Sequence, residues 1–232
     1  MKVDKYIGHS GFCSRRKASL LIDEKKVTVN GKTATHSTKL KEGDIVKINN
    51  LTIPSLCPEF FYIAYNKPKG IECTIEKKEG NIIDALNLPI DLLPVGRLDK
   101  NSEGLILLTN HKHIIDKIIN PKFKHEKEYI VTLNHPVTEE FLSTIQNGVI
   151  INGEKTKPCK AWLEPNSKRV FRIVLTQGLN RQIRRMCTLF NYQVIKLQRV
   201  RVMHIYLHQI KLGEWRLLSD KELTELIARC NE

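Results

Sequence analysis

The sequence predicts an α+β protein with two domains of unequal size. A length of 232 residues allows one or two domains, and two prolines within residues 51–59 interrupt regular structure there. Segments with helical and with strand patterns are mixed elsewhere, without the regular strand–helix alternation of parallel folds. We therefore expect a small domain over residues 1–50, a linker over 51–59, and a larger domain over 60–232 with a mixed, largely antiparallel sheet flanked by helices.

The small domain is predicted to contain two short helices and a hairpin. Apolar residues recur through residues 4–25 with a break at Gly11, and Ser14 is placed to cap the second helix. Residues 27–32 alternate and then contain Asn-Gly, the pair typical of a tight hairpin turn. A further turn and an apolar strand over 45–48 complete the expected unit.

The larger domain contains seven segments with the composition of strands and four with the spacing of helices. The expected strands lie at 61–66, 105–108, 128–133, 149–151, 159–163, 170–176 and 194–200. The expected helices lie at 113–120, 138–146, 180–190 and 219–229. Caps support two helices, because Thr138 begins one and Ser219 with Glu222 has the spacing of a capping box.

The charge balance is strongly basic. Lys and Arg total 38 against 25 acids, so the net charge is +13 and the pI is near 9.5. Such an excess predicts a polyanionic partner, with nucleic acid first and an anionic membrane second. No apolar run approaches the ~18 residues of a membrane span, and the N-terminus leads into no signal-peptide core. We therefore expect a cytoplasmic protein that binds nucleic acid and no membrane.

Neither a metal nor a cofactor site is expected. The six cysteines are dispersed without a Cys-x-x-Cys pair, so they indicate reduced, mostly buried thiols rather than zinc ligands or disulfides. His111 and His113 form a tight pair, but no third ligand stands at a metal-site spacing. The sequence also contains no glycine-rich loop of the kind that cradles phosphates.

Two segments concentrate the positive charge. Residues 1–50 hold 11 Lys and Arg against five acids, and residues 165–213 hold ten Lys and Arg with no acid. A solvated face usually mixes both signs, so the second segment favours a track for phosphates. Its cations are Lys168, Arg169, Arg172, Arg181, Arg184, Arg185, Lys196, Arg199, Arg201 and Lys211.

The most informative block runs over residues 96–110. It sets one carboxylate, Asp99, between Arg97 and Lys100, and then leads through Gly104 into an apolar strand. Cations beside a lone acid at the edge of a buried strand can keep that acid ionised and oriented. A turn with a surface salt bridge is the alternative on spacing alone.

Five segments resemble, in order, the motifs of the pseudouridine synthases of the RsuA/RluB/RluE/RluF group. They are Asn-Lys-Pro-Lys-Gly at 66–70, Gly-Arg-Leu-Asp-Lys at 96–100, His-Glu-Lys-Glu-Tyr at 125–129, Gln-Gly-Leu-Asn-Arg-Gln-Ile-Arg-Arg-Met at 177–186 and Leu-Gly-Glu-Trp-Arg at 212–216. The match covers nearly the whole chain and is most similar to the RluF type. It implies isomerisation of uridine to pseudouridine without a cofactor. Large-subunit ribosomal RNA is the favoured partner, transfer RNA is a second candidate, and a monomer is expected because the RNA supplies the large partner surface.

Residues 1–50 resemble the α-L motif, a small RNA-binding module shared with a small-subunit ribosomal protein. The resemblance implies that one basic helix face and the loop after it contact RNA phosphates, whereas a merely solvated basic face is the alternative. One departure is visible, because Lys25 and Lys26 stand where the family usually has Gly, which removes the easy left-handed helix cap. The implied RNA contacts are Ser14, Arg15, Arg16, Lys17 and Lys32.

In the larger domain, the resemblance implies that Asp99 is the nucleophile and that Arg184 carries its salt bridge. Tyr129 could stack on an extruded base and could serve in proton transfer, although without the neighbouring motifs a core aromatic would be the simpler interpretation. Arg181 and Arg185 lie four apart on the predicted helix, so both are expected to face the RNA backbone. The other residues expected to contact the RNA are Arg97, Leu98, Lys100, Gln182 and Ile183.

Two other functions are compatible with parts of the sequence. A non-catalytic RNA-binding or ribosome-associated protein would explain the charge and the small domain, but not the joint presence of Asp99, Tyr129 and Arg184. A hydrolase with paired carboxylates would use Asp99 and Glu103. Both acids fall in one tight turn, however, and only two tryptophans are available to line a sugar cleft.

Overall fold

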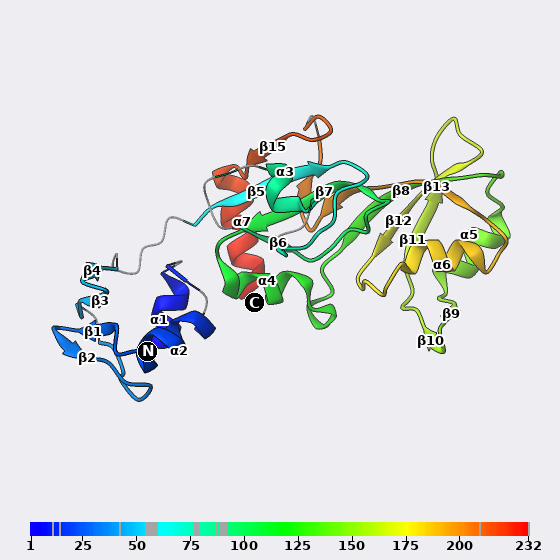
Figure 1. Cartoon of the computed structure of the whole chain (residues 1–232). Coiled ribbons are helices and arrows are strands. Elements are labelled where there is room, and N and C mark those ends of the chain that lie inside the picture. The colour runs from blue at the N-terminus through cyan, green and yellow to red at the C-terminus, as the bar shows by residue number, and fades with distance from the viewer. Residues whose placement is uncertain are drawn as a thin grey trace. The chain divides into compact units, whose positions relative to one another are not determined.

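The chain divides into two compact units (Figure 1). One comprises residues 1–60 with 110–112, and the other residues 61–109 with 113–232. The computed structural model describes residues 1–10, 12–13, 15–41, 43–53, 60–76, 79–86, 88, 92–208 and 210–231. Ser14 and most of the expected linker lie outside the described residues.

The first unit pairs two helices with a small antiparallel sheet. Its helices are α1 (Val3–His9) and α2 (Arg15–Asp23), and its strands are β1 (Val27–Val29), β2 (Lys32–Thr33), β3 (Val46–Ile48) and β4 (Leu51–Thr52), in the order β2-β1-β3-β4. The predicted Asn-Gly hairpin is confirmed, because Asn30 and Gly31 both have positive φ, at 49° and 81°. Residues 51–53 belong to this unit rather than to a linker, since β4 pairs with β3 and Ile53 is buried in the same core.

Lys25 takes the left-handed conformation that glycine usually supplies after a helix. Its φ is 55°, its N–H donates to the carbonyl of Ile22 (3.0 Å), and the N–H of Lys26 reaches back to the carbonyl of Leu21 (2.9 Å). These two bonds close the end of α2 in the manner of a glycine-terminated helix. The loop therefore keeps its geometry at a backbone cost of about 1 kcal/mol.

The second unit is organised around a nine-stranded sheet. Its main order is β11-β12-β8-β13-β7-β5-β15, with β14 paired to β13 and β6 paired to β7. Among the described strands of this sheet, only β13 and β7 pair in parallel, so the predicted mixed, largely antiparallel sheet is confirmed. The strands are β5 (Tyr62–Lys67), β6 (Leu93–Val95), β7 (Glu103–Thr109), β8 (Lys127–Leu133), β11 (Lys160–Leu163), β12 (Val170–Leu175), β13 (Val194–Val202), β14 (Ile205–Tyr206) and β15 (Trp215–Leu217), and β9 (Ile150–Ile151) with β10 (Glu154–Lys155) forms a separate hairpin.

Helices pack on both faces of the sheet around β5 and β7. One face packs on α4 (Lys112–Ile119) and α7 (Asp220–Asn231), and the other on α3 (Ile82–Leu86). Burial on both faces explains why residues 105–108 form an uninterrupted apolar run. Around β8 and β12, one face packs on α5 (Glu139–Gln146) and α6 (Gln182–Thr188).

The predicted caps are present, but one helix is shorter than expected. Thr138 Oγ1 accepts from the N–H of Phe141 (3.2 Å), and Ser219 and Glu222 form the reciprocal capping box. The helix expected over 180–190 begins only at residue 182, because Arg181 has a φ of 50°. None of the helices in the described ranges is long and apolar enough to cross a membrane.

Replacing Lys25 with Gly should stabilise the first unit by about 1 kcal/mol, since the substitution relieves the left-handed strain of a residue with a Cβ. Slower amide hydrogen exchange in peptides from residues 1–53 of the full-length chain would measure the gain. Lys25→Ala is the matched control, because it removes the same charge but keeps a Cβ. Equal stabilisation by Ala and Gly would show that charge, not backbone strain, sets the effect.

Candidate active site

Asp99 lies in the loop between β6 and β7, and backbone hydrogen bonds fix that loop on both sides. The carbonyl of Asp99 accepts from the N–H of Ser102 (2.9 Å), and the carbonyl of Lys100 accepts from the N–H of Gly70 (2.8 Å). The preceding residue, Leu98, is buried against β5 and β7. These contacts leave the Asp99 side chain half-buried at the rim of the sheet.

Three neighbouring strands bring this loop close to Tyr129. Tyr129 on β8 pairs with Arg199 on β13, and Arg199 pairs with Gly104 on β7, five residues after Asp99. Tyr129 packs against two hydrophobic core clusters, of which one contains Leu98 and the other contains Ile183. The loop of Asp99, the ring of Tyr129 and α6 therefore meet at one junction.

Arg184 connects α6 to the same loop through carbonyl groups. Its Nη2 donates to the carbonyl of Asn101 (2.9 Å) and its Nη1 to the carbonyl of Val194 (3.1 Å). Burial and repulsion from Arg181 lower the pKa of this guanidinium, and the attraction of Asp99 acts in the opposite direction. Its buried Nε has no hydrogen-bond partner among the described residues.

Two buried cations lie beneath the loop, although the sequence predicted Arg199 only for the phosphate track and gave Lys67 no role of its own. Lys67 is fully buried and donates to the carbonyls of Pro68 (2.8 Å) and Ile71 (2.9 Å). Arg199 is 3% exposed and donates to the carbonyls of Leu105 (2.6 Å) and Arg97 (3.3 Å). Burial lowers the pKa of Lys67, while Asp99 is among the nearby groups that favour its charged form.

A third cation on this face is also perturbed. Lys127 lies two residues before Tyr129 on β8, so both side chains project to the same face of the strand. Burial, reinforced by repulsion from Arg199, lowers the pKa of Lys127 to about 8. The floor around Asp99 is therefore cationic, with positive charge supplied from β5, β13 and α6.

Gly104 is required where β7 and β13 come together. A Cβ at this position would lie 2.3 Å from the carbonyl oxygen of Arg199 and 2.8 Å from its nitrogen, and φ is +106°. No side chain fits so close to backbone atoms. The absence of a side chain at residue 104 thus sets the separation between the Asp99 loop and the strand that pairs with Tyr129.

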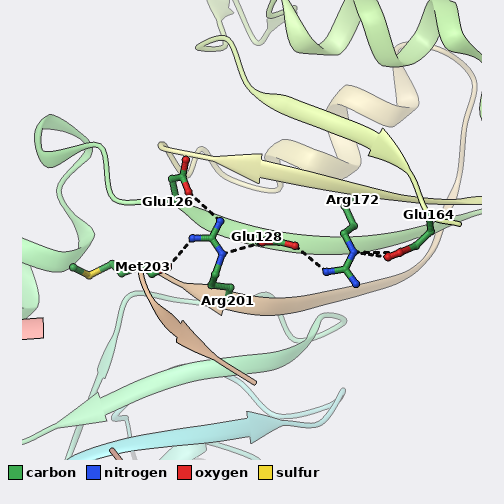
Figure 2. Close-up of polar contacts among 6 residues, drawn as sticks. All are labelled: Glu126, Glu128, Glu164, Arg172, Arg201 and Met203. Atoms are coloured by element: carbon green, nitrogen blue, oxygen red, sulfur yellow. Dashed lines mark hydrogen bonds and ion pairs between the residues drawn. The ribbon is translucent and has the colours of Figure 1, made fainter. Parts of the chain in front are cut away.

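The other face of β8 carries a network of ion pairs (Figure 2). Glu128 accepts from Arg172 Nη1 (2.8 Å) and from Arg201 Nε (2.9 Å). Arg172 also pairs with Glu164, and Arg201 with Glu126 (3.0 Å). Because Glu128 directly precedes Tyr129, the network joins β8 to both neighbouring strands beside the site.

A β-bulge in β13 sends two nearby arginines to opposite faces. Arg199 stands opposite Tyr129 and Arg201 opposite Glu128, with Val200 as the extra residue between them. In a regular strand, residues two apart would share a face. Arg199 therefore supports the Asp99 loop, while Arg201 joins the ion-pair network.

The sequence of this unit matches a known family. Residues 61–189 match the RNA pseudouridylate synthase family, which is more than half of the chain. The chain belongs to this family. It is therefore an isomerase that acts on RNA, and the expected pseudouridine synthase is confirmed, whereas a non-catalytic binding protein is not favoured. Residues 1–46 match the S4 domain, which confirms the expected ribosomal-protein-type module.

Individual relatives agree with this assignment. The dual-specificity RNA pseudouridine synthase RluF of Escherichia coli (strain K12) is 49% identical over 228 residues, covering 97% of this chain and 78% of the relative. The ribosomal large subunit pseudouridine synthase B of Bacillus subtilis (strain 168) is 33% identical over 98% of this chain and 96% of the relative. A crystal structure of a pseudouridylate synthase aligns with a TM-score of 0.70 and 28% identity, over 97% of this chain and 99% of that one.

Several contacts of this pseudouridine synthase differ from the sequence expectations. Among the described residues, no ion pair joins Asp99 to Arg184, because the guanidinium is directed to two backbone carbonyls. Lys100 pairs with Glu72 (3.3 Å) and does not flank Asp99 as a partner. The side chain of Arg97 is exposed, and this residue contributes its carbonyl to Arg199.

Three of the residues expected to touch RNA serve the interior, and one of them is Leu98, which is buried against β5 and β7. Gln182 is 4% exposed, and its Oε1 accepts from the N–H of Leu179 (3.0 Å). Ile183 packs in the hydrophobic core beneath α5 and α6. Arg181 is exposed and precedes the first residue of α6, so the prediction that Arg181 and Arg185 both lie within one helix is wrong. Arg185 is half-buried and donates to Asn180 Oδ1 (2.9 Å).

The positive stretch over 165–213 is only partly available to RNA. Arg172 and Arg201 are neutralised by the network of Figure 2, Lys196 pairs with Glu103 (2.9 Å), and Arg199 is buried. The acids come from other segments of the sheet, so a scan along this stretch could not reveal them. In the first unit, Arg15 pairs with Asp4 (2.6 Å), and the side chains of Arg16, Lys17 and Lys32 are exposed.

Gly104→Ala should lower the free energy of unfolding of the second unit by about 3 kcal/mol, because the added Cβ collides with the backbone of Arg199. Urea unfolding followed by tryptophan fluorescence reports this unit, since both tryptophans lie in it. Gly153→Ala is the control, because φ there is +80° but nothing lies within 4 Å. Similar losses in the two variants would refute the importance of the contact.

Glu128→Gln should destabilise the same unit by about 2 kcal/mol at pH 7, because Arg172 and Arg201 lose a shared partner. Burial raises the pKa of Glu128, but the arginine hydrogen bonds outweigh burial and hold the pKa below 4.5. The stabilisation is therefore present above about pH 4.5 and is lost as pH falls through the lower folded-state pKa. Urea titrations from pH 7 to pH 3 should show the variant and the wild type converging, with exposed Glu154→Gln unchanged throughout.

Proposed function

We propose that this enzyme isomerises uridines of ribosomal RNA, with Asp99 as the group that attacks or takes the proton. The observation that carries the proposal is the junction of the fixed Asp99 loop, Tyr129 and Arg184 above buried Lys67 and Arg199. One carboxylate in a cationic setting suits a reaction that needs no net oxidation or reduction. The names of the relatives, which mention the large ribosomal subunit and dual specificity, support a ribosomal substrate.

The reaction exchanges one bond for another within the same nucleotide. The N1–C1′ bond of uridine breaks, the base turns, and C5 bonds to C1′; the proton lost from C5 is balanced by the proton gained at N1. On one route, Asp99 Oδ attacks C1′, the uracil leaves with the bonding electrons, and C5 later displaces the carboxylate. On the other, Asp99 removes the 2′ proton and the uracil leaves as the glycal forms; C5 then bonds to C1′ while Asp99 returns the proton to C2′. The arrangement of the site is compatible with both routes.

Access to C1′ requires the target nucleotide to leave its stack. Unstacking costs a few kcal/mol, which contacts to the RNA backbone can offset. The ring of Tyr129, partly buried between the two core clusters, offers a surface for the extruded base. Exposed Arg181 in the second unit and exposed Arg16, Lys17 and Lys32 in the first offer phosphate contacts.

The substrate class follows from chemistry and from the relatives together. We propose large-subunit ribosomal RNA as the principal substrate and transfer RNA as the second candidate, the latter because one relative is named for dual specificity. A monomer would be sufficient, because the RNA provides the extended partner surface. The cytoplasm, where ribosomal RNA is available, is the proposed compartment.

Asp99→Asn should abolish pseudouridine formation, because an amide neither attacks C1′ nor removes a proton, while RNA affinity stays within about threefold of the wild type. The test maps pseudouridine chemically in ribosomal and transfer RNA from cells lacking the gene, complemented with wild type, Asp99→Asn or the exposed control Asp116→Asn. Wild type and the control should restore the same sites, and Asp99→Asn none. Restoration by Asp99→Asn would refute the role of Asp99, and restoration confined to transfer RNA would refute the ribosomal substrate.

A further inference from the structure

A polar hollow of about 560 Å³ lies beside Arg184, between α6 and the adjoining ends of β8 and β13. Arg181, Arg184 and Thr188 line its helical side, and Asn134, Asn191 and Gln193 line the side formed by the strand ends. These six residues define what we call the α6 hollow. Such a volume is within the range of ligand sites and exceeds what one inorganic ion requires.

The helical side of the α6 hollow presents two cations and a hydroxyl along one stripe. Arg184 and Thr188 are one turn apart, and Arg181 precedes the helix with a φ of 50°. The side chain of Arg181 is exposed and that of Arg184 is half-buried. Arg184 also donates to Asn101, two residues after Asp99, so the hollow adjoins the loop of the candidate active site.

The opposite side is held in place by reciprocal hydrogen bonds. The N–H of Gln193 donates to Asn134 Oδ1 (2.8 Å), and the N–H of Asn134 donates to the carbonyl of Gln193 (3.1 Å). The amide group of Asn134 is thereby oriented at the end of β8 before any ligand binds. Preorganised polar groups of this kind reduce the entropy lost on binding.

The charge of the α6 hollow selects an anionic ligand. Among the described side chains that line it, two are arginines and none is acidic. The positive charges of Arg181 and Arg184 repel each other, and an anion between them would relieve that repulsion. Guanidinium groups bind phosphate oxygens well, and neutral amides and hydroxyls suit the sugar hydroxyls of RNA.

We propose that the α6 hollow binds the sugar–phosphate backbone of a nucleotide that neighbours the uridine at Asp99. This inference rests on the proposed function and deepens it, because it gives the RNA strand a direction away from the Asp99 loop and across Arg184. Binding there would hold the strand on one side of the extruded uridine. The site carries no base-specific contact in this assignment, so it contributes affinity and register rather than sequence choice.

Thr188→Glu tests the proposal by placing a negative charge in the α6 hollow. Thr188 is exposed, and its hydroxyl donates to the carbonyl of Arg184 one turn earlier (2.9 Å). With a stem-loop RNA containing the target uridine, the variant should raise KM about tenfold and make the salt dependence of binding shallower by about one phosphate contact. The effect on kcat should be much smaller than the effect on KM.

Two controls separate this charge effect from others. Thr188→Gln has the size of the Glu variant without its charge, so it should raise KM at least about threefold less than Thr188→Glu does. Thr144→Glu adds the same charge to α5 at another threonine that donates to a carbonyl one turn earlier, and it should leave KM and kcat unchanged. Equal KM values for Thr188→Glu and Thr188→Gln would overturn the proposal, although pseudouridine formation by the wild type would still uphold the proposed function.

Neutral methylphosphonate linkages locate the contact along the RNA. The linkages are introduced one at a time on each side of the target uridine. A neutral linkage at the position that the α6 hollow binds should weaken binding of the RNA to the wild type and to Thr144→Glu. The same linkage should weaken binding to Thr188→Glu less. A neutral linkage loses its attraction to the arginines, but in this variant it also escapes repulsion by the introduced carboxylate. The proposal is overturned if no linkage within a few nucleotides of the uridine shows this coupling.

Discussion

The parallel contact between β7 and β13 holds together two antiparallel halves of one sheet. The β7–β5 half carries the loop of Asp99, and the β13–β8–β12 half carries Tyr129 and packs against α6. No side chain fits at residue 104 between them, and Arg199 spans the contact by bonding carbonyls of both the strand and the loop. The separation of Asp99 from Tyr129 is therefore set by backbone packing, which gives the preorganisation that catalysis in a fixed geometry requires.

The sequence predicted the parts of this architecture that depend on local pattern. The buried run of β7, the Asn-Gly hairpin, the Thr138 cap and the Ser219–Glu222 box each carry their signal within a few residues. β6, β14 and β15 were missed because strands of two or three residues are too short to show a period. The start of α6 was placed too early because nothing in the composition around Arg181 indicates its left-handed backbone.

The sequence predicted that the candidate site residues lie near one another, but it did not predict their contacts. Asp99, Tyr129 and Arg184 do lie around one junction, but the buried cations Lys67 and Arg199 could not be recognised, because charged residues are normally exposed. Their burial depends on carbonyl groups supplied by distant segments. The charge counted along the chain also overstated the number of cations that RNA can contact. Acids of β8 and of the segments next to β8 and β11 neutralise cations of β12 and β13.

The bulge at Val200 is a functional feature of β13. It changes the phase of the strand, so that arginines two positions apart serve opposite sides of the sheet. A regular strand through residues 199–201 would instead place both guanidinium groups on the same side, leaving either the carbonyls of the Asp99 loop or the carboxylate of Glu128 without its partner. The one unpaired residue of the bulge therefore lets a single strand serve two separate sites on opposite faces of the sheet.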